Sequence, residues 1–346
     1  MDNKNYTERL LSQILKEPTN IQNYLELSNI YISQNDYNSA LDVYKRLLNI
    51  DPLNVEALIN AGSLCYFLKD FERAISYYYR ATEMETNNFY IYFNLANALC
   101  EVKKYDKAYE YYKKSLDLHV DDYLVFNAIG LMYQDMDNIV QAKIFYQKAI
   151  NLSPESSEAY MNMAGIFMKT ECFDIALNNY LKAFELDNDN PKIPLCIANA
   201  YSSLKNFEKA DKYFKKTIEI APLDAQGYIC YGLSYSDRGD GENAIKCYEK
   251  ASEILPDSPN PFILMGNVYS YQKKYDKALE YYKKAEDLEP NVSSIMILSA
   301  NVKVLQENLK EALYIYRKAS NLSPKNNELK LIYFDLLKDY MDKKGA

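Results

Sequence analysis

An alanine recurs every 34 residues along this chain of 346 residues, with no insertion or deletion between successive copies. The series is Ala40, Ala74, Ala108, Ala142, Ala176, Ala210, Ala244, Ala278 and Ala312. A fixed period of this length is typical of repeat proteins, in which small structural units stack on their neighbours. The series therefore predicts one elongated array of nine units rather than two ordinary globular domains.

Each alanine belongs to a helical pattern of apolar residues. Four residues after it stands an aromatic side chain, in the series Tyr44, Tyr78, Tyr112, Tyr146, Tyr180, Phe214, Tyr248, Tyr282 and Tyr316. Three residues later the side chain is usually small, as at Ala81. Spacings of four and three place all three residues on one face of a helix. A proline such as Pro154 often follows and ends that helix.

A second helical pattern precedes each alanine. Twelve residues before it the side chain is always small, in the series Ser28, Gly62, Ala96, Gly130, Ala164, Ala198, Gly232, Gly266 and Ala300. Aromatic residues often stand four residues before and three residues after this position. Because small residues let two backbones approach closely, each unit is predicted to be a pair of antiparallel amphipathic helices. The predicted fold class is all-α.

Several segments resemble the tetratricopeptide repeat, including residues 142–154 (AKIFYQKAINLSP) and 278–290 (ALEYYKKAEDLEP). The resemblance covers residues 21–326 as nine tandem repeats, and it implies a right-handed α-solenoid, a superhelix of antiparallel helix pairs with a 34-residue period. Residues 1–20 are expected to form an N-terminal capping helix (a half repeat), and residues 327–346 a C-terminal capping helix with a polar outer side. Pro191 and Pro194 predict a late start of one first helix or a local change in stacking, which makes this place the candidate for a hinge. The alternative is an ordinary variation in capping.

Composition and charge exclude several classes of protein. The formal net charge is −8, and no basic footprint of the kind found in nucleic-acid binders is present. The first 18 residues contain no apolar stretch typical of a signal peptide, and no apolar run is long enough to span a bilayer. We therefore expect a cytoplasmic protein that neither binds nucleic acid nor inserts into a membrane.

The sequence contains few residues or motifs that could support catalysis or metal binding. The six cysteines are scattered singly, which predicts reduced thiols, and His119 is the only histidine. One histidine without a nearby nucleophile indicates neither a metal site nor a catalytic triad. Phosphate-binding loops, dinucleotide-binding motifs, zinc-protease motifs and nucleophile elbows are absent from the sequence. No cofactor, metal or enzymatic activity is expected.

In the family that this chain resembles, the first helices line a concave groove that commonly binds an extended peptide or a partner's helix. The resemblance places several asparagines at the sixth and ninth positions of the units, namely Asn29, Asn60, Asn94, Asn97, Asn162, Asn199, Asn267 and Asn301. An asparagine amide both donates and accepts hydrogen bonds, so a ladder of amides could hold a peptide backbone. The alternative is that these amides only tie neighbouring repeats together.

Two further features of the expected groove concern its partners. The family's carboxylate clamp for chaperone tails is expected to be absent, because Leu25, Tyr90 and Asn94 occupy matching positions where cations would be needed. Later repeats place aliphatic residues in the groove, and the candidates for exposed apolar contacts are Leu264, Leu298 and Leu305. Such a strip could bind the amphipathic helix of a partner.

The leading functional hypothesis is a non-enzymatic scaffold for protein–protein interaction that binds a peptide or a partner protein along its concave groove. The alternative is the regulatory or substrate-binding region of a larger enzyme, such as an O-linked N-acetylglucosamine transferase-like protein. A third possibility is a membrane-associated assembly factor, which would need an anchored partner. The 22 residues after Pro324 are expected to form only a cap, which favours the scaffold.

Overall fold

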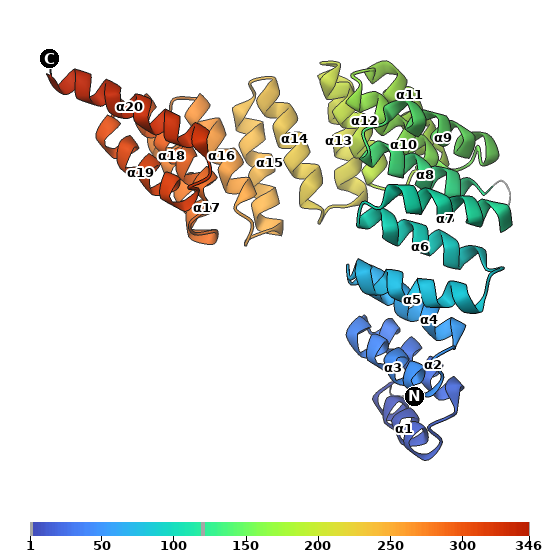
Figure 1. Cartoon of the computed structure of the whole chain (residues 1–346). Helices are drawn as coiled ribbons and strands as arrows, with labels where there is room; N and C mark the ends of the chain where they lie inside the picture. The colour runs from blue at the N-terminus through green and yellow to red at the C-terminus, as the bar shows by residue number, and fades with distance from the viewer. Residues whose placement is uncertain (1–2, 119–121, 346) are drawn as a thin grey trace. The chain divides into compact units, whose positions relative to one another are not determined.

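The computed structural model describes residues 3–118 and 122–345, with side chains placed from Tyr6 to Asp342 except in the gap. His119 lies outside the described residues. Within them, every regular element is an α-helix, and consecutive helices pack against each other from α1 to α9 in the first part of the chain and from α11 to α20 in the second (Figure 1). This confirms the predicted all-α solenoid of helix pairs. The chain divides into two compact units, Met1–Ile166 and Phe167–Ala346.

The first unit begins with a single helix, and paired helices follow. Its helices are α1 (Asn3–Lys16), α2 (Ile21–Ser33), α3 (Tyr37–Ile50), α4 (Val55–Phe67), α5 (Phe71–Met84), α6 (Phe89–Glu101), α7 (Tyr105–Leu118), α8 (Tyr123–Asp135), α9 (Ile139–Leu152) and most of α10 (Ser157–Lys169). In Figure 1 they run in chain order from blue to green.

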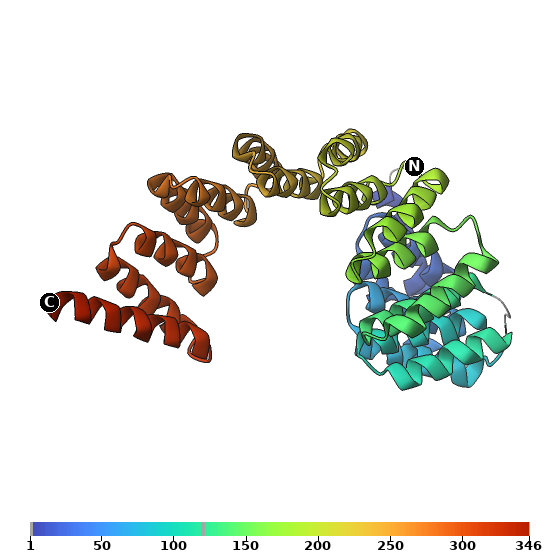
Figure 2. The same ribbon diagram turned by 90° about the horizontal axis from the view of Figure 1, so that it is seen from above.

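The second unit continues the same pairing, and its later helices follow one another in chain order in both ribbon views (Figures 1 and 2). Its helices are α11 (Phe173–Leu186), α12 (Lys192–Ser203), α13 (Phe207–Ile220), α14 (Ala225–Asp237), α15 (Gly241–Ile254), α16 (Asn260–Tyr271), α17 (Tyr275–Leu288), α18 (Ser293–Leu305), α19 (Leu309–Leu322) and α20 (Asn327–Gly345). The predicted late start near Pro191 is present, since α12 begins at Lys192 and has 12 residues, whereas α14 has 13.

The turn inside each repeat explains where the second helices begin. The residue two before the helix adopts a left-handed conformation, with φ of 58° at Lys103 and 80° at Gly239. The next residue is often an N-cap: the Asp36 carboxylate accepts a hydrogen bond from the Ser39 amide at 3.1 Å. Such caps satisfy an amide that the first helical turn leaves without a partner. Local residues therefore set the start of the second helix.

The crossing of the two helices depends on the small residues. All nine alanines of the 34-residue series are completely buried. At Gly130 of α8, an added Cβ would lie 2.5 Å from two carbons of the Tyr146 ring in α9. The ring therefore occupies the space that a glycine leaves open, as the sequence pattern predicts.

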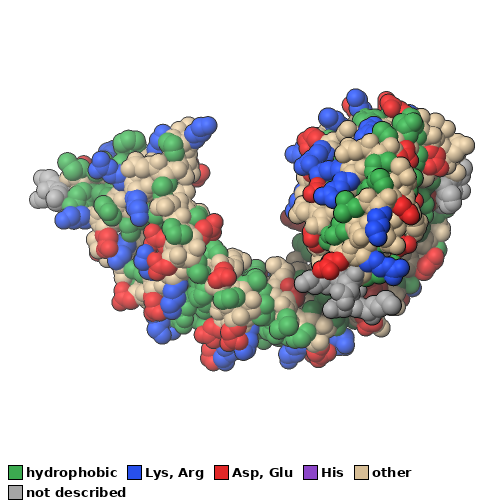
Figure 3. Space-filling view, turned by 90° about the horizontal axis from the view of Figure 1, so that it is seen from below, with side chains coloured by type: hydrophobic (Ala, Val, Ile, Leu, Met, Phe, Trp, Pro, Cys, Tyr) green, Lys and Arg blue, Asp and Glu red, His purple; other side chains and the backbone are tan. Residues whose placement is uncertain are grey.

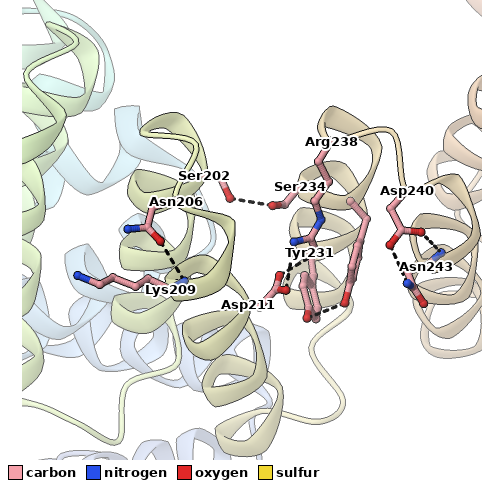
Figure 4. Close-up of polar contacts among 10 residues, drawn as sticks. Ser202, Asn206, Lys209, Asp211, Tyr231, Ser234, Arg238, Asp240 and Asn243 are labelled. Atoms are coloured by element: carbon pink, nitrogen blue, oxygen red, sulfur yellow. Dashed lines mark hydrogen bonds and ion pairs between the residues drawn. The ribbon is translucent and has the colours of Figure 1, made fainter.

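The junction between α13 and α14 in the second unit carries a polar link (Figure 4). The Arg238 guanidinium donates to both carboxylate oxygens of Asp211, at 2.8 and 3.1 Å. Its central carbon also lies 4.0 Å from the centroid of the Tyr235 ring, whose hydroxyl donates to the Tyr231 hydroxyl at 2.8 Å. A bidentate, half-buried pair of this kind holds geometry better than an exposed ion pair.

The helices at the ends of the chain each pack one face on the array. Leu10 of α1 is 1% exposed, and Leu329 of α20 is 2% exposed. The outer side of α20 departs from the expected polar cap, because four large apolar side chains of that helix are exposed: Leu331, Ile332, Phe334 and Met341. Charged residues stand between them in the sequence, so the outer surface of α20 is mixed.

Candidate functional site

First helices of neighbouring repeats approach each other in part of each compact unit. First helices of successive repeats contact each other, α4 with α6 and α6 with α8 in the first unit, and α12 with α14 in the second. These approaches bend the array toward its first helices between α4 and α8 and between α12 and α14. The sixth and ninth positions, which lie on these helices, therefore belong to what we call the inner face.

Three ninth-position asparagines share one arrangement. The buried tyrosine of the same repeat donates its hydroxyl hydrogen to the amide oxygen, at 2.6 Å from Tyr112 to Asn97 and at 2.7 Å from Tyr282 to Asn267. Tyr316 donates to Asn301 in the same way. Because the oxygen is used, the Nδ2 group keeps both of its hydrogens for another acceptor. The inner face thus presents amide donors whose orientation the core fixes.

The other repeats satisfy the same hydroxyl with different partners. Ser63 lies 3.0 Å from the Tyr78 hydroxyl, and Gln134 accepts from Tyr146 at 3.0 Å. Burial raises the pKa of Tyr78 and of Tyr282 to about 12. The hydroxyls therefore remain protonated donors at any physiological pH, and the amide orientations do not change with pH.

Asn162 behaves differently. Its Nδ2 donates to Oδ1 of Asn127 at 3.0 Å, and Asn127 in turn donates to the Glu158 carboxylate at 3.1 Å. This chain of hydrogen bonds ties α8 to α10, as the alternative interpretation of the asparagines predicts. Asn127 is 4% exposed and occupies a fifth position, which the search of the sixth and ninth positions missed. The available signal was that the fifth position is apolar in the other repeats, as at Phe93 and Met161.

The remaining asparagines of the predicted groove lie in mixed surroundings. Asn29 is exposed, while Asn60 hydrogen bonds to the buried Tyr44. Asn199 hydrogen bonds to Cys230 of the next repeat. Asn94 and Asn97 come together at a small polar hollow of about 190 Å³ between α4 and α6, lined also by Ser63, Tyr66 and Tyr78. The structure therefore groups the early asparagines only in part.

The three aliphatic candidates of the later repeats differ in exposure. Leu305 is 55% exposed, whereas Leu264 and Leu298 are half-buried and pack against core residues. Leu264 also lines a cavity of about 350 Å³ between α14 and α16, beside Leu233, Tyr271 and Gln272. No pattern in the sequence indicates a role for Tyr271 or Gln272.

Two further features are the distribution of surface charge and the state of the cysteine thiols. On the face seen in Figure 3, acidic and basic side chains are interspersed with apolar ones. The six cysteines are free thiols, and burial raises the pKa of Cys100 and of Cys247 to about 11. Within residues 3–118 and 122–345, no three His, Cys, Asp or Glu side chains gather where they could hold a metal ion. In the same part of the chain, no helix has both the length and the apolar character needed to cross a bilayer.

Comparison with known proteins places these observations in a family. Family models described as tetratricopeptide repeat or TPR repeat match residues 29–67, 55–88, 77–110, 124–156, 197–222, 223–289 and 263–327. No curated protein matches the chain.

Two solved structures are similar to parts of the chain. YrrB, whose crystal structure is described as that of a TPR protein with an unusual peptide-binding site, is 21% identical over 52% of this chain and 92% of its own, with a TM-score of 0.41. MamA is 22% identical over 47% of this chain and 95% of its own, with a TM-score of 0.42.

Tetratricopeptide proteins are typically non-catalytic and bind protein or peptide partners, so the repeats support a protein-interaction scaffold. Since the family models match repeats from residue 29 to residue 327, and the helix pairs keep the 34-residue period between them, the chain belongs to the tetratricopeptide repeat family.

Proposed function

We propose that the inner face binds an extended segment of a partner protein, and that its amides donate hydrogen bonds to the backbone carbonyls of that segment. The observation that supports this most directly is the fixed orientation of three amides. Asn97, Asn267 and Asn301 each use Oδ1 to accept from a core tyrosine, which leaves Nδ2 free of any partner among the described residues. A donor held by the core loses little conformational entropy when it binds.

Backbone recognition suits an amide better than a charged group. Every residue of an extended segment offers a carbonyl oxygen, so donors on successive repeats, such as Asn267 and Asn301, can bind a chain of varied sequence. Selectivity would then come from side-chain pockets near the donors. A capping role for residues 1–20 and 327–346 belongs to the same proposal, supported by the burial of Leu10 and Leu329.

The test removes the donors and keeps the core contacts. The triple variant Asn97→Asp, Asn267→Asp and Asn301→Asp retains an oxygen that can accept from each tyrosine, but it places a carboxylate where the donor stood. Each lost hydrogen bond is worth about 0.5–1.5 kcal/mol. Capture of partner proteins from native lysate, quantified by mass spectrometry, should therefore fall by at least about tenfold.

A matched control carries the same change of charge elsewhere. Asn49 of α3, Asn151 of α9 and Asn321 of α19 are exposed on second helices, and the triple Asn→Asp variant at these positions should capture partners as the wild type does. Equal capture by the inner-face variant and this control would refute the role of the amides.

A further inference from the structure

One position of the repeat carries an unusual residue type in the second unit. Three residues before each alanine of the 34-residue series, the first residue of the second helix is large and apolar in eight repeats: Tyr37, Phe71, Tyr105, Ile139, Phe173, Phe207, Tyr275 and Leu309. In the remaining repeat this residue is Gly241, the first residue of α15. Six of the eight large side chains are aromatic, so Gly241 removes a ring from a repeated packing position.

The other repeats show what the missing ring contacts. The Tyr37 ring lies 4.4 Å from that of Phe67, measured between centroids, and Tyr275 packs against the cluster that contains Val302. By the 34-residue period, Tyr271 corresponds to Phe67 and Val268 corresponds to Val302. These two residues are therefore the equivalent partners of Gly241. Both line the cavity of about 350 Å³ between α14 and α16. Tyr271, which has no ring beside it there, is 86% exposed.

Gln272 fills part of the space above Gly241. A methyl group built on Gly241 would collide with the amide nitrogen of Gln272, and the amide oxygen of Gln272 is buried without a hydrogen-bond partner. The equivalent residue one repeat later, Gln306, instead donates to Asp276 at 3.1 Å, and the aromatic Tyr275 occupies the place of the glycine. The comparison indicates that the Gln272 amide occupies the cavity at the cost of a hydrogen bond, and that a better-fitting group could displace it.

The lining of the cavity indicates the chemistry of that group. Leu233, Leu264 and Val268 supply apolar walls, and the exposed Tyr271 ring supplies a surface for stacking. The carboxylate of Asp237 also lines the cavity and forms no ion pair with any described residue. At about 350 Å³ the cavity is small, near the lower end of the range for ligand pockets, which suits one ring rather than a larger ligand.

We propose that this cavity binds one aromatic side chain of the partner segment, phenylalanine or tyrosine, in the place that the repeat's own ring fills elsewhere. A lysine or arginine next to that residue in the partner contacts Asp237. This inference rests on the proposed binding of an extended segment along the inner face, and it assigns the segment a basic–aromatic sequence at the α14–α16 position.

The experiment uses small probes and the full chain. N-acetyl-Lys-Tyr-amide, N-acetyl-Glu-Tyr-amide and N-acetyl-Lys-Leu-amide are titrated at millimolar concentration, while the backbone amide signals of Gly239 and Gly241 are followed by NMR. The Lys-Tyr probe should give a saturable shift and bind at least threefold more tightly than either of the others. Asp237→Asn should remove the difference between the Lys-Tyr and Glu-Tyr probes.

Two variants change the cavity in opposite directions. Gly241→Tyr restores the ring that Tyr275 supplies in the next repeat, and the flexible Gln272 can move away, so the array should fold while the Gly239 shift disappears. Gln272→Ala adds no bulk and should tighten binding of the Lys-Tyr probe at least threefold. Gly165→Tyr, at a glycine with open space around its Cβ position, is the matched control and should bind the probe as the wild type does.

The outcomes separate this inference from the proposed function. Absence of a saturable shift in the wild type, equal binding of the Lys-Leu probe, or full binding by Gly241→Tyr would overturn the aromatic pocket. Asn267 also lines this cavity, but every chain used with the probes keeps Asn97, Asn267 and Asn301. The probe experiment can therefore fail while the capture experiment with the amide variants succeeds, and the reverse.

Discussion

Gly130 offers a direct test of how the two helices of a repeat cross. The substitution Gly130→Ala adds one methyl group to α8, at a point where it would lie 2.5 Å from Cδ1 and Cε1 of Tyr146. Carbon atoms in ordinary contact are about 3.5–4.0 Å apart, so the ring or the helix must move by roughly 1 Å. The Tyr146 ring is completely buried and has no open space to enter.

Three contributions decide the sign of the effect. Replacing glycine by alanine inside a helix stabilises it by about 1 kcal/mol. Overpacking of a filled core costs about 1–3 kcal/mol. Movement of the ring also weakens the hydrogen bond from Tyr146 to Gln134, which is 3.0 Å long and is worth about 0.5–1.5 kcal/mol. The net result should be a loss of about 2 kcal/mol in the free energy of opening α8 from α9.

Gly165 provides the matched control. It also lies inside a first helix, α10, but a Cβ added there would meet no atom within 4 Å. Only the higher helix propensity of alanine contributes there, so Gly165→Ala should stabilise its helix by about 0.5–1 kcal/mol. The two substitutions are chemically identical and are expected to change stability in opposite directions.

Hydrogen exchange measured by mass spectrometry reads each effect locally, which suits a repeat array whose units need not unfold together. A loss of about 2 kcal/mol corresponds to roughly 30-fold faster exchange in peptides that cover α8 and α9. Protection in Gly130→Ala equal to the wild type or higher would refute the reasoning. It would mean that α8 and α9 adopt, without cost, the spacing of repeats that carry alanine at this position.

Three other expectations concern the turns, caps and thiols. Lys103→Gly should raise the midpoint of urea unfolding by removing the left-handed strain at φ 58°, worth about 1 kcal/mol, and an unchanged or lower midpoint would contradict this. Hydrogen bonds from Ser39 lower the pKa of Asp36, so its cap stabilises α3 above the unfolded carboxyl's pKa and is lost as the pH falls through the lower folded value. Hydrogen exchange of the α3 amides should therefore speed up at acid pH in the wild type. Asp36→Asn should abolish this acid-dependent rise, and a rise that persists in the variant would belong to another titrating group. At pH 8 a maleimide should label the exposed Cys172 before Cys100 and Cys247, whose burial raises their pKa to about 11, and peptide mapping that finds them labelled together would exclude this order.

The sequence predicted the helix pairs because each pair depends on residues that lie close together in the chain and recur with a fixed period. The alanine series, the small residue twelve positions earlier and the aromatic four positions later are all confirmed at the crossing, as Gly130 and Tyr146 show. The last helix agrees with its prediction only in part: Asp335 and Lys338 are exposed as expected, but Leu331 and Phe334 are exposed as well.

The candidate site was predictable only as a set of positions. Their positions in the repeat placed Asn97 and Asn162 on the same helical face, but the sequence did not distinguish their roles. The amide of Asn97 accepts from Tyr112 of its own repeat and keeps a free donor, whereas Asn162 donates to Asn127 of the preceding repeat. The difference arises from which polar atoms the packing of neighbouring helices brings within 3 Å, and no local pattern specifies that.

By itself, then, the sequence determined the period, the pairing of helices and the family, since nine repetitions of one short-range pattern leave little freedom for the backbone. Tertiary structure decided which inner-face groups are free to bind. It oriented the amides through core hydroxyls, and it turned the single Gly241 into a cavity by placing Tyr271 and Gln272, some 30 residues later in the chain, around the space of a missing ring. Such consequences depend on contacts between successive repeats, where the exact shape of each side chain matters and the period no longer constrains the outcome.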